Sequence, residues 1–410
     1  MSIKKEKIPI VRFKDFSEPW FQNQLSEVAE FSKGRGYSKK DLQFHGTPII
    51  LYGRLYTSYE SVISNVETYA NLEENSVVSE GGEVIIPASG ESADDISRAS
   101  CVIDRGIILG GDLNIVRPRE YLNSLFIAIT LSNGSQQREL SKRAQGKSVV
   151  HLHNSDLKAV KLFYPSYEEQ SVIGSLFRIL DDLLASYKDN LVNYQSLKMT
   201  MLSKIFPKAG QTVPEIRLDG FEGEWGKYYL GDIFEQVSNY IEPSKENELW
   251  SLTVEKGLTP KTNRYKRDFL VKKNDKFKKV DVQEFVYNPM NLTLGALDLN
   301  DNEVTISVSG YYVVMKNRNM EKFDNDFLKI LLKTTYAIYQ YKQFATGTLI
   351  EKQRVQFPTF SEIPFYLPPI AEQQAIGTYF SNLDNLINSH QEKIFQLETL
   401  KKKLLQDMFI

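Results

Sequence analysis

Cysteine and histidine are scarce in this sequence of 410 residues, which contains one cysteine, Cys101, and four histidines. A single cysteine excludes an intramolecular disulfide and a cysteine-rich zinc module, and it fits a reducing compartment. The sequence has no run of 18 apolar residues, and no apolar segment of signal-peptide length follows its first five residues. We therefore expect a cytoplasmic protein without membrane contact.

The sequence also lacks an excess of either charge. Its 50 Lys and Arg residues face 52 Asp and Glu residues, which gives a net charge of -2. This balance is weak evidence against a nucleic-acid partner, because such binding needs only a local basic face. The length predicts two to three domains.

Enzyme motifs are incomplete wherever they begin. The sequence 146–148, Gly-Lys-Ser, resembles the end of a phosphate-binding loop, but Ser141 stands where that loop needs glycine. The sequence 288–290, Asn-Pro-Met, resembles an amino-methyltransferase motif but lacks its second proline and its aromatic residue. We interpret it as a turn at the end of a strand. A self-contained enzyme is therefore disfavoured.

The remaining reactive side chains form no convincing catalytic group. His151 and His153 have no further ligand at metal-binding spacing, so a surface pair or a phosphate contact is expected. Asp181 and Asp182 are expected on the solvated face of a helix. Cys101 has no activating base nearby in the sequence and is expected to be a buried small hydrophobic residue.

What the sequence does contain is a duplication. Residues 165–206 recur as residues 368–409 with 14 identities in 42 positions, where chance would give about two or three. A shorter repeat has an offset of 205 and pairs Pro9/Pro214, Arg12/Arg217, Trp20/Trp225 and Leu25/Leu230. The segments between, roughly 21–160 and 226–362, do not resemble each other. Each half is thus a similar leading strand, a divergent globular domain and a similar helix.

The repeated helices are long and regular. Apolar or aromatic residues recur at steps of three and four from Phe177 to Ile205 and again from Phe380 to Met408. This period is close to that of a coiled coil, and about 39 residues make a rod of roughly 58 Å. Prolines precede both helices, and Pro207 follows the first. We expect the two helices to pack as an antiparallel or crossed pair; the alternative folds each helix back on its own domain.

The fold class that follows is α+β: a tandem duplication of a mixed, β-rich domain followed by a long helix, with antiparallel pairing of the helices and pseudo-two-fold symmetry. The expected boundaries are 1–163 for domain 1, 164–207 for helix 1, 208–362 for the linker and domain 2, and 363–410 for helix 2. Strand-forming runs lie at 84–86, 106–109, 284–287 and 311–314, and a helix is expected in each domain at 121–131 and 327–341.

Local basic clusters are the strongest sign of a ligand. Residues 261–279 contain nine basic and two acidic residues, with aromatic residues between them. Smaller clusters lie at residues 33–40, beside Gly34 and Gly36, and at residues 138–147. Glycine beside Lys or Arg lets a backbone approach a phosphate closely, so these clusters favour nucleic acid. A solvated charged surface is the alternative for each.

The whole layout closely resembles the specificity subunit of type I restriction-modification systems. The resemblance rests on the duplicated frame and on the helix starts Pro-Ser-Tyr-Glu-Glu-Gln at 165–170 and Pro-Pro-Ile-Ala-Glu-Gln at 368–373. Ser166 departs from the usual second proline. The resemblance covers essentially the whole chain, but the family itself diverges in the recognition domains.

The resemblance implies a non-catalytic subunit that reads a split, asymmetric DNA sequence, one half per domain, with the helices as a spacer. It implies double-stranded DNA and, as partners, two modification methyltransferase subunits and two restriction ATPase/nuclease subunits. S-adenosylmethionine, ATP and Mg would be bound by those partners, and this chain would carry no cofactor. A specificity subunit of a stand-alone methyltransferase and a coiled-coil scaffold without DNA remain alternatives.

The candidate DNA-binding residues come from the basic clusters and the adjoining loops. The candidates for phosphate contacts in both domains are Lys33, Arg35, Lys142, Arg143, Lys147, Arg264, Lys266, Arg267, Lys352 and Arg354. Tyr37 belongs to the first of these loops. The candidates for base contacts are Arg54, Tyr56, Ser89, Asn263 and Tyr311.

Overall fold

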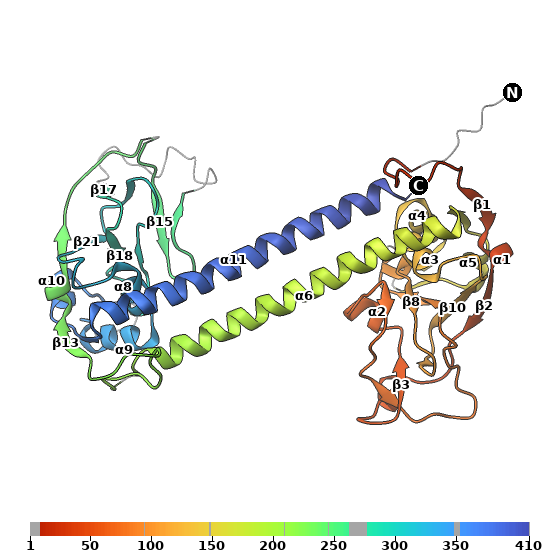
Figure 1. The fold of residues 1–410 in the computed structure, drawn as a ribbon, viewed down its shortest axis with the longest axis horizontal. Helices are drawn as coiled ribbons and strands as arrows, with labels where there is room; N and C mark the ends of the chain where they lie inside the picture. The colour runs from red at the N-terminus through yellow and green to blue at the C-terminus, as the bar shows by residue number, and fades with distance from the viewer. Residues whose placement is uncertain are drawn as a thin grey trace. The chain divides into compact units, whose positions relative to one another are not determined.

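The computed structural model describes residues 9–93, 95–146, 149–208, 210–244, 246–261, 277–347 and 353–409. The chain forms two compact units, Met1–Asp189 with Glu392–Ile410, and Asn190–Gln391. Both divisions fall inside long helices, so each unit contains one globular domain and a segment of each helix (Figure 1).

Domain 1 is built on an antiparallel sheet. The strands β2 (Ala29–Lys33), β10 (Leu113–Pro118), β6 (Glu83–Pro87) and β8 (Ser100–Val102) lie in this order, and β4 (Val62–Ile63) adds a parallel edge. A separate small sheet contains β5 (Tyr69–Ala70), β3 (Thr47–Ile50) and β9 (Ile108–Leu109). Cys101 lies in β8 and is 4% exposed, which confirms the expectation of a buried side chain. Burial raises the pKa of its thiol to about 12.

Domain 2 has the same central sheet despite its different sequence. The strands β14 (Phe234–Val237), β21 (Val313–Asn317), β18 (Phe285–Tyr287) and β19 (Leu297–Leu299) repeat the order β2, β10, β6, β8. The additions differ: domain 2 carries the pairs β15 (Trp250–Thr253) with β16 (Gly257–Pro260) and β17 (Phe277–Val280) with β20 (Ile306–Ser309). The divergence in sequence therefore reflects different insertions on one shared sheet.

A strand pair closes each domain beside its long helix. In domain 1, β1 (Phe21–Gln24) and α1 (Leu25–Val28) precede β2, and β1 pairs with β12 (Lys161–Tyr164). In domain 2, β13 (Gly226–Tyr229) and α7 (Leu230–Ile233) precede β14, and β13 pairs with β22 (Pro364–Leu367). The predicted leading strand therefore lies later than the repeat indicated: residues 9–20 and 213–225 form no strand, and β1 and β13 begin where the divergent segments were placed. The two strand pairs bring the ends of each domain together.

Two short helices, rather than one, cover each sheet. In domain 1 they are α3 (Ser124–Leu131) and α4 (Gly134–Arg143), and in domain 2 they are α8 (Asn325–Leu331) and α9 (Thr335–Phe344). The single helix predicted over residues 327–341 is therefore wrong. The chain breaks at Thr334, whose hydroxyl accepts a hydrogen bond from the backbone N–H of Ala337 and so caps the start of α9. A short helix, α5 (Asn154–Lys158) or α10 (Phe357–Ser361), follows in each domain.

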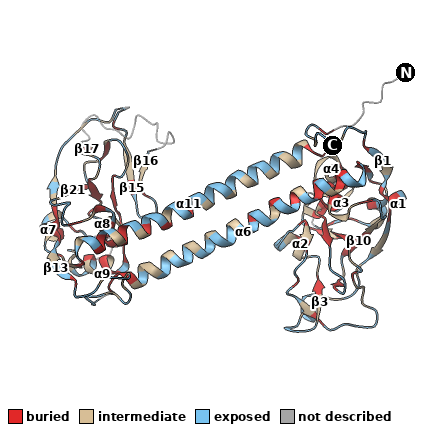
Figure 2. Ribbon diagram, viewed as in Figure 1, coloured by how far each residue is buried: buried red, intermediate tan, exposed pale blue. Residues whose placement is uncertain are grey.

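The long helices are confirmed as α6 (Tyr167–Ile205) and α11 (Ile370–Asp407), of 39 and 38 residues. Within the first unit, α6 and α11 run antiparallel, since Asp181 pairs with Lys401 and, one to two turns on, Lys188 pairs with Glu398. The contacts of Lys198 with Asp384 and of Phe206 with Phe380 show the same direction in the second unit. Figure 2 shows that burial concentrates in the domains and at the helix segments that contact them.

The repeated Glu-Gln motif fastens each helix to its domain. The carboxylate of Glu169 accepts two hydrogen bonds from the Arg12 guanidinium, at 2.7 and 2.6 Å. The equivalent Arg217 makes the same two-pronged contact with Glu372. Both carboxylates are buried, with 1% and 0% of the side chain exposed. The Arg and the Glu that recur in both halves of the sequence therefore form one buried ion pair in each unit.

The glutamine that follows holds the first covering helix. Gln170 accepts a hydrogen bond from the backbone N–H of Asn123, the residue that caps α3, and donates one to the Pro165 carbonyl at 2.9 Å. Gln373 makes the same two contacts, with Asp324 ahead of α8 and with the Pro368 carbonyl.

A glycine one turn further along makes this contact close. A Cβ atom at Gly377 would lie 3.0 Å from the Asp324 carboxylate and 3.1 Å from the Phe327 nitrogen, and Gly174 faces Asn123 in the same way. The Glu-Gln and Gly repeats thus position the domain on its helix.

Each domain core is completed by the end of the other repeat's helix. Phe409, which follows α11, packs against Phe126 and Phe177 in the first unit. In the second unit, Phe206, which follows α6, packs against Phe327 and Phe380. This reciprocal exchange, together with the antiparallel helices within each unit, is the contact pattern that the predicted pseudo-two-fold duplication requires.

Candidate nucleic-acid interface

The first basic loop presents two free cations beside glycines that serve the fold. Lys33, at the end of β2, and Arg35 are exposed. A Cβ at Gly34 would lie 1.9 Å from the Gly110 carbonyl oxygen, and one at Gly111 would lie 2.8 Å from the Gly36 oxygen. Gly34 is therefore required by close approach of two backbone segments of domain 1, whereas a Cβ at Gly36, where φ is 60°, would meet no described atom within 4 Å. The expectation that glycine leaves room for a phosphate is corrected for Gly34 and stays a prediction for Gly36, and Lys33 and Arg35 remain candidates.

Three predicted contact residues of domain 1 make hydrogen bonds within that domain. The Tyr37 hydroxyl donates to the Asn71 carbonyl and shares a hydrogen bond with Ser76. The Arg54 guanidinium donates to the Glu60 carboxylate and to the Asn65 carbonyl, both at 2.7 Å.

Tyr56 is the third, and its hydroxyl donates to the Ser89 carbonyl at 2.7 Å; burial raises its pKa. These contacts give Tyr37, Arg54 and Tyr56 structural roles within domain 1, and their assignment as DNA contacts stays a prediction. The Ser89 hydroxyl is half-buried and lies 3.4 Å from Nδ1 of His151.

The last turn of α4 contains two predicted contact residues, Lys142 and Arg143, which have different surroundings. Lys142 is exposed and keeps its role as a candidate for a phosphate contact. Arg143 donates to the Glu139 carboxylate at 2.8 Å and to the Ala159 carbonyl at 3.3 Å, and its side chain is 34% exposed. Arg143 therefore anchors the helix to the segment after α5, and its assignment to DNA stays a prediction.

Most of the basic stretch of domain 2 lies outside the described residues. The candidates outside the described residues are Asn263, Arg264, Lys266 and Arg267 in this stretch, and Lys147 and Lys352 elsewhere. Two described members are committed to the fold. Lys278 is 7% exposed and donates to the Tyr312 carbonyl at 2.7 Å, and burial lowers its pKa. Lys279 pairs with Asp281. Tyr311, in the turn between β20 and β21, is 89% exposed and remains a candidate for a contact with DNA.

Each domain closes a hairpin directly after its second covering helix. Gln145 and His151 exchange two backbone hydrogen bonds in domain 1, as do Thr346 and Arg354 in domain 2. The side chains of these four residues are exposed. The His151 and His153 rings are parallel, 6.3 Å apart, which confirms the expectation of a surface pair.

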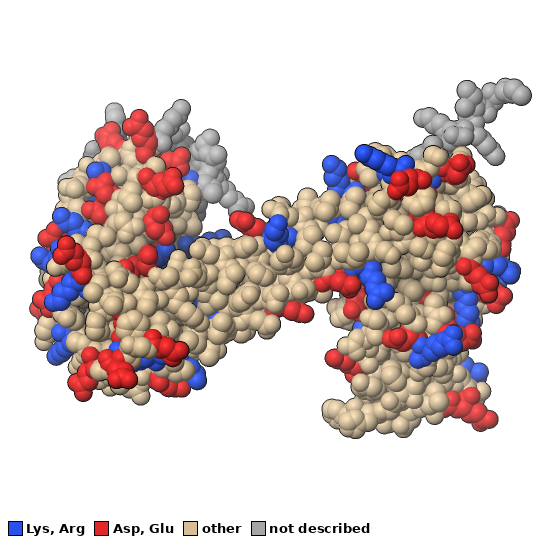
Figure 3. Space-filling model, in the orientation of Figure 1, with Lys and Arg blue, Asp and Glu red and all other residues tan. Residues whose placement is uncertain are grey.

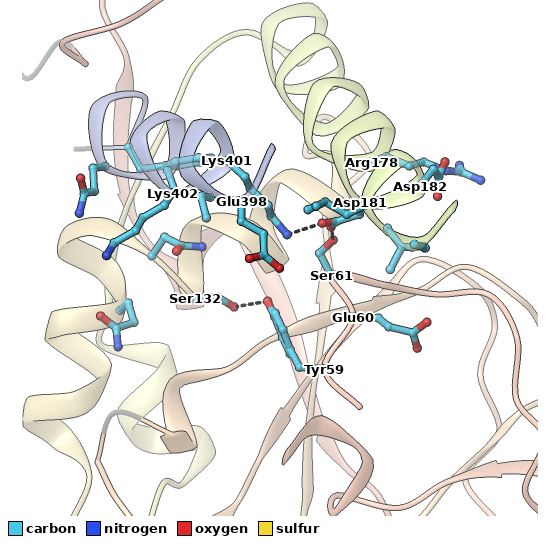
Figure 4. Close-up of a pocket in the computed structure, with 18 of the residues that line it drawn as sticks. Tyr59, Glu60, Ser61, Ser132, Arg178, Asp181, Asp182, Glu398, Lys401 and Lys402 are labelled. Carbon is cyan, nitrogen blue, oxygen red and sulfur yellow. Dashed lines mark hydrogen bonds and ion pairs between the residues drawn. The ribbon is translucent and has the colours of Figure 1, made fainter. Parts of the chain in front are cut away.

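A groove of about 980 Å³ lies in the first unit between domain 1 and the helix segments (Figure 4). Asp181 lies at its centre, where it accepts hydrogen bonds from the Ser61 hydroxyl and from Lys401. The expectation that Asp181 is only solvated is therefore wrong. Five basic and four acidic side chains line the groove: Arg138, Arg178, Lys188, Lys401, Lys402, Glu60, Asp181, Asp182 and Glu398. Such mixed charge suits a bonded junction between domain and helices.

Basic and acidic side chains are interspersed over the face drawn in Figure 3. Within the described ranges, no group of three or more His, Cys, Asp or Glu side chains is arranged to hold a metal ion. In that same part of the chain, no helix has the length and apolar character needed to span a membrane.

Comparison with known proteins resolves the family. A model of the type I restriction modification DNA specificity domain matches the chain twice, at residues 17–193 and 222–399. The chain belongs to this family. Each match contains one globular domain and most of one long helix, and the two domains are target-recognition domains of a type I restriction-modification specificity subunit.

Two similar proteins agree with this assignment. The type I restriction enzyme MjaVIII specificity subunit of Methanocaldococcus jannaschii is 20% identical over 407 residues, which cover 95% of this chain and 91% of that protein. The crystal structure of the type I restriction-modification system S subunit from M. genitalium covers 98% of this chain and 99% of that chain. It has a TM-score of 0.60 at 14% identity and shows the shared fold.

The specificity subunit also contains functional candidates that composition and charge patterns missed. Gln145, Thr346 and Met290 lie at the hairpin bases or beside them and are exposed, but none belongs to a basic cluster. Their sequence signal is the pair of sequences Gly-Lys-Ser at 146–148 and Gly-Thr at 347–348, which follow the covering helices in both repeats. That signal locates the hairpins without indicating which side chains they expose.

Proposed function

We propose that this specificity subunit reads a bipartite, asymmetric DNA sequence, with one half-site for each domain, and has no catalytic activity of its own. The observation that carries the proposal is that two domains with the same central sheet carry different insertions. The same ion pair, Arg12–Glu169 or Arg217–Glu372, joins each domain to its long helix. A common sheet provides a common way of approaching DNA. Different insertions provide different readers, so the two half-sites should differ.

The absence of catalysis in this proposal is supported by what the reactive side chains do. Asp181 is bonded to Ser61 and Lys401, and the Cys101 thiol is buried. Asn288 follows β18, and its side chain accepts a hydrogen bond from the backbone N–H of Met290, as in a turn. S-adenosylmethionine, ATP and Mg²⁺ would then be bound by methyltransferase and ATPase/nuclease partners.

Paired docking sites for two methyltransferase subunits would suit the duplication. Equivalent leucines remain exposed on the helix segments of both units: Leu183 and Leu400 in the first, Leu386 and Leu197 in the second, at 41–47%. Exposed apolar side chains of this kind favour a protein partner. We expect Leu183→Lys with Leu400→Lys to reduce the number of methyltransferase subunits that co-purify from two to one.

Exchange of one domain tests DNA reading. Residues 230–362 would be replaced by those of another specificity subunit, which leaves β13 and β22 paired as in the native chain. With its methyltransferase partner present, the hybrid should methylate sites changed in the second half only. A matched exchange of residues 25–160, which keeps β1 and β12, should change the first half only. Joint change of both half-sites in either hybrid would refute independent reading.

A further inference from the structure

The hairpin bases of the two domains occupy one equivalent position. Gln145 and His151 exchange backbone hydrogen bonds of 3.1 and 2.8 Å, and Thr346 and Arg354 exchange bonds of 3.0 and 2.9 Å. His151 and Arg354 lie 203 residues apart, which is the offset of the repeated helices. One position of the duplicated fold therefore carries imidazole in domain 1 and guanidinium in domain 2.

The next residue fixes this position against the central sheet. The backbone N–H of Leu152 donates to the Ala88 carbonyl, and that of Val355 donates to the Pro289 carbonyl, each at 3.0 Å. Ala88 follows β6, and Pro289 lies just after the equivalent strand β18. Both hairpin bases are thus joined to the loop beyond the same strand of the shared sheet.

Positive backbone angles show that the start of each hairpin is a defined structure. Gly146 and Gly347, each one residue after the bridge begins, have φ of 140° and 119°. A Cβ at Gly146 would lie 1.9 Å from the Val149 carbonyl oxygen, so only glycine fits there. Because the hairpin base is held in this way, the side chains attached to it have a fixed position on the domain surface.

The side chains at this position are exposed and largely uncommitted. Arg217 and Arg318, in the same unit as Arg354, donate to the carboxylates of Glu372 and Glu235. The Arg354 guanidinium makes no such pair with any residue that the structure describes. In domain 1, His151 faces the Ser89 hydroxyl with Nδ1, which leaves Nε2 for another partner. Each domain therefore presents one hydrogen-bonding side chain from the rigid start of its hairpin.

We propose that this position reads a base in each half-site, with Arg354 donating to one guanine and His151 contacting one base-edge acceptor through Nε2. The inference rests on the proposed function. A guanidinium can donate two parallel hydrogen bonds to O6 and N7 of guanine in the major groove. Imidazole offers a single contact there. The two half-sites would differ at this position because the two side chains differ in geometry.

Substitution of Arg354 tests the reading of the second half-site. In the complex with its methyltransferase partner, Arg354→Ala should weaken binding to the cognate duplex by about 10- to 100-fold and binding to random duplex by less than about twofold. Arg354→Gln should favour adenine at the affected position. Lys227→Ala is the matched control, since it removes an exposed cation of β13 in the same unit, and it should leave cognate binding unchanged.

Substitution of His151 tests the equivalent position independently. His151→Arg should increase the preference for guanine at one position of the first half-site and leave the second half-site as in the wild type. Equal loss of cognate and random binding by Arg354→Ala would show a phosphate contact and overturn the inference, as would an unchanged preference in both variants. Failure of the proposed function would look different, because the wild-type complex would then show no sequence preference at all.

Discussion

Removal of the Arg217 side chain should destabilise the second unit strongly. The Glu372 carboxylate is completely buried, and Arg217 supplies both hydrogen bonds that bridge it to residues ahead of domain 2. The hydrogen bond to Glu372 raises the pKa of the Arg217 guanidinium, so this side chain keeps its positive charge. Leaving a buried carboxylate without its partner costs about 3–5 kcal/mol. We expect Arg217→Met to fall in this range.

Urea unfolding followed by tryptophan fluorescence measures this effect. Trp225 is 4% exposed in the core of the second unit and packs against Phe327. It becomes the reporter of that unit when Trp20→Phe and Trp250→Phe remove the other two tryptophans. With a urea dependence of about 2–3 kcal/mol per molar, a loss of 3 kcal/mol lowers the midpoint by about 1–1.5 M.

Two further variants separate charge burial from packing. Replacing the whole pair, with Arg217→Met and Glu372→Leu together, should restore the free energy of unfolding to within about 1 kcal/mol of the starting protein, because no unpaired charge remains. Lys208→Met is the matched control: its pair with Glu215 is 59% and 45% exposed, so its cost should stay below about 0.5 kcal/mol. A loss below 1 kcal/mol for Arg217→Met, or a double variant no better than the single one, would refute the reasoning.

Three other predictions use different measurements. Changing three cations of the domain 2 basic stretch to Ala should weaken specific and random DNA binding alike and reduce the slope of log K against log salt by about 0.9 per lost contact; an unchanged slope would contradict the assignment of Arg264, Lys266 and Arg267. Inserting one heptad after Asn190 and one after Lys393 should lengthen each helix by roughly 10 Å and shift the preferred spacer between half-sites by about three base pairs, with some loss of affinity from groove rotation. Methylation of targets with graded spacers checks this, and a preference for the original spacer would show that the helices are not the ruler. The Cys101 thiol should not react with a thiol reagent at pH 8 until urea unfolds the protein, because its raised pKa of about 12 and its burial keep it protonated and inaccessible; rapid reaction of the native protein would contradict this.

The frame of the fold could be predicted because duplication and periodicity are written directly in the sequence. The offset repeats located α6 to within three residues at each end. The second helix was placed too early, because β22 occupies residues 364–367 of its predicted range and α11 begins at Ile370. The bonds made by the repeated residues could not be predicted. Glu169 and Arg12 lie 157 residues apart, and only the folded domain brings the carboxylate to the guanidinium.

The candidate site was predicted less well because local charge does not show what a cation contacts. Arg54 and Arg143 looked free in the sequence, yet each finds a carboxylate four to six residues away as well as a backbone carbonyl. Similarly, the shared central sheet was hidden because its strands need only apolar residues of suitable size. The insertions on that sheet dominate any comparison of the two sequences.

The exchange of helix ends between the two repeats imposes an order of assembly on the nascent chain. Phe206 is synthesised before the core residues Phe327 and Phe380 that it contacts, so the second domain can close as it emerges. Phe409 is made 283 residues after its partner Phe126. At about 5–20 residues per second, that interval lasts roughly 15–55 s. During this interval the first domain lacks part of its core. A chaperone or a protease would therefore act on the chain at this stage.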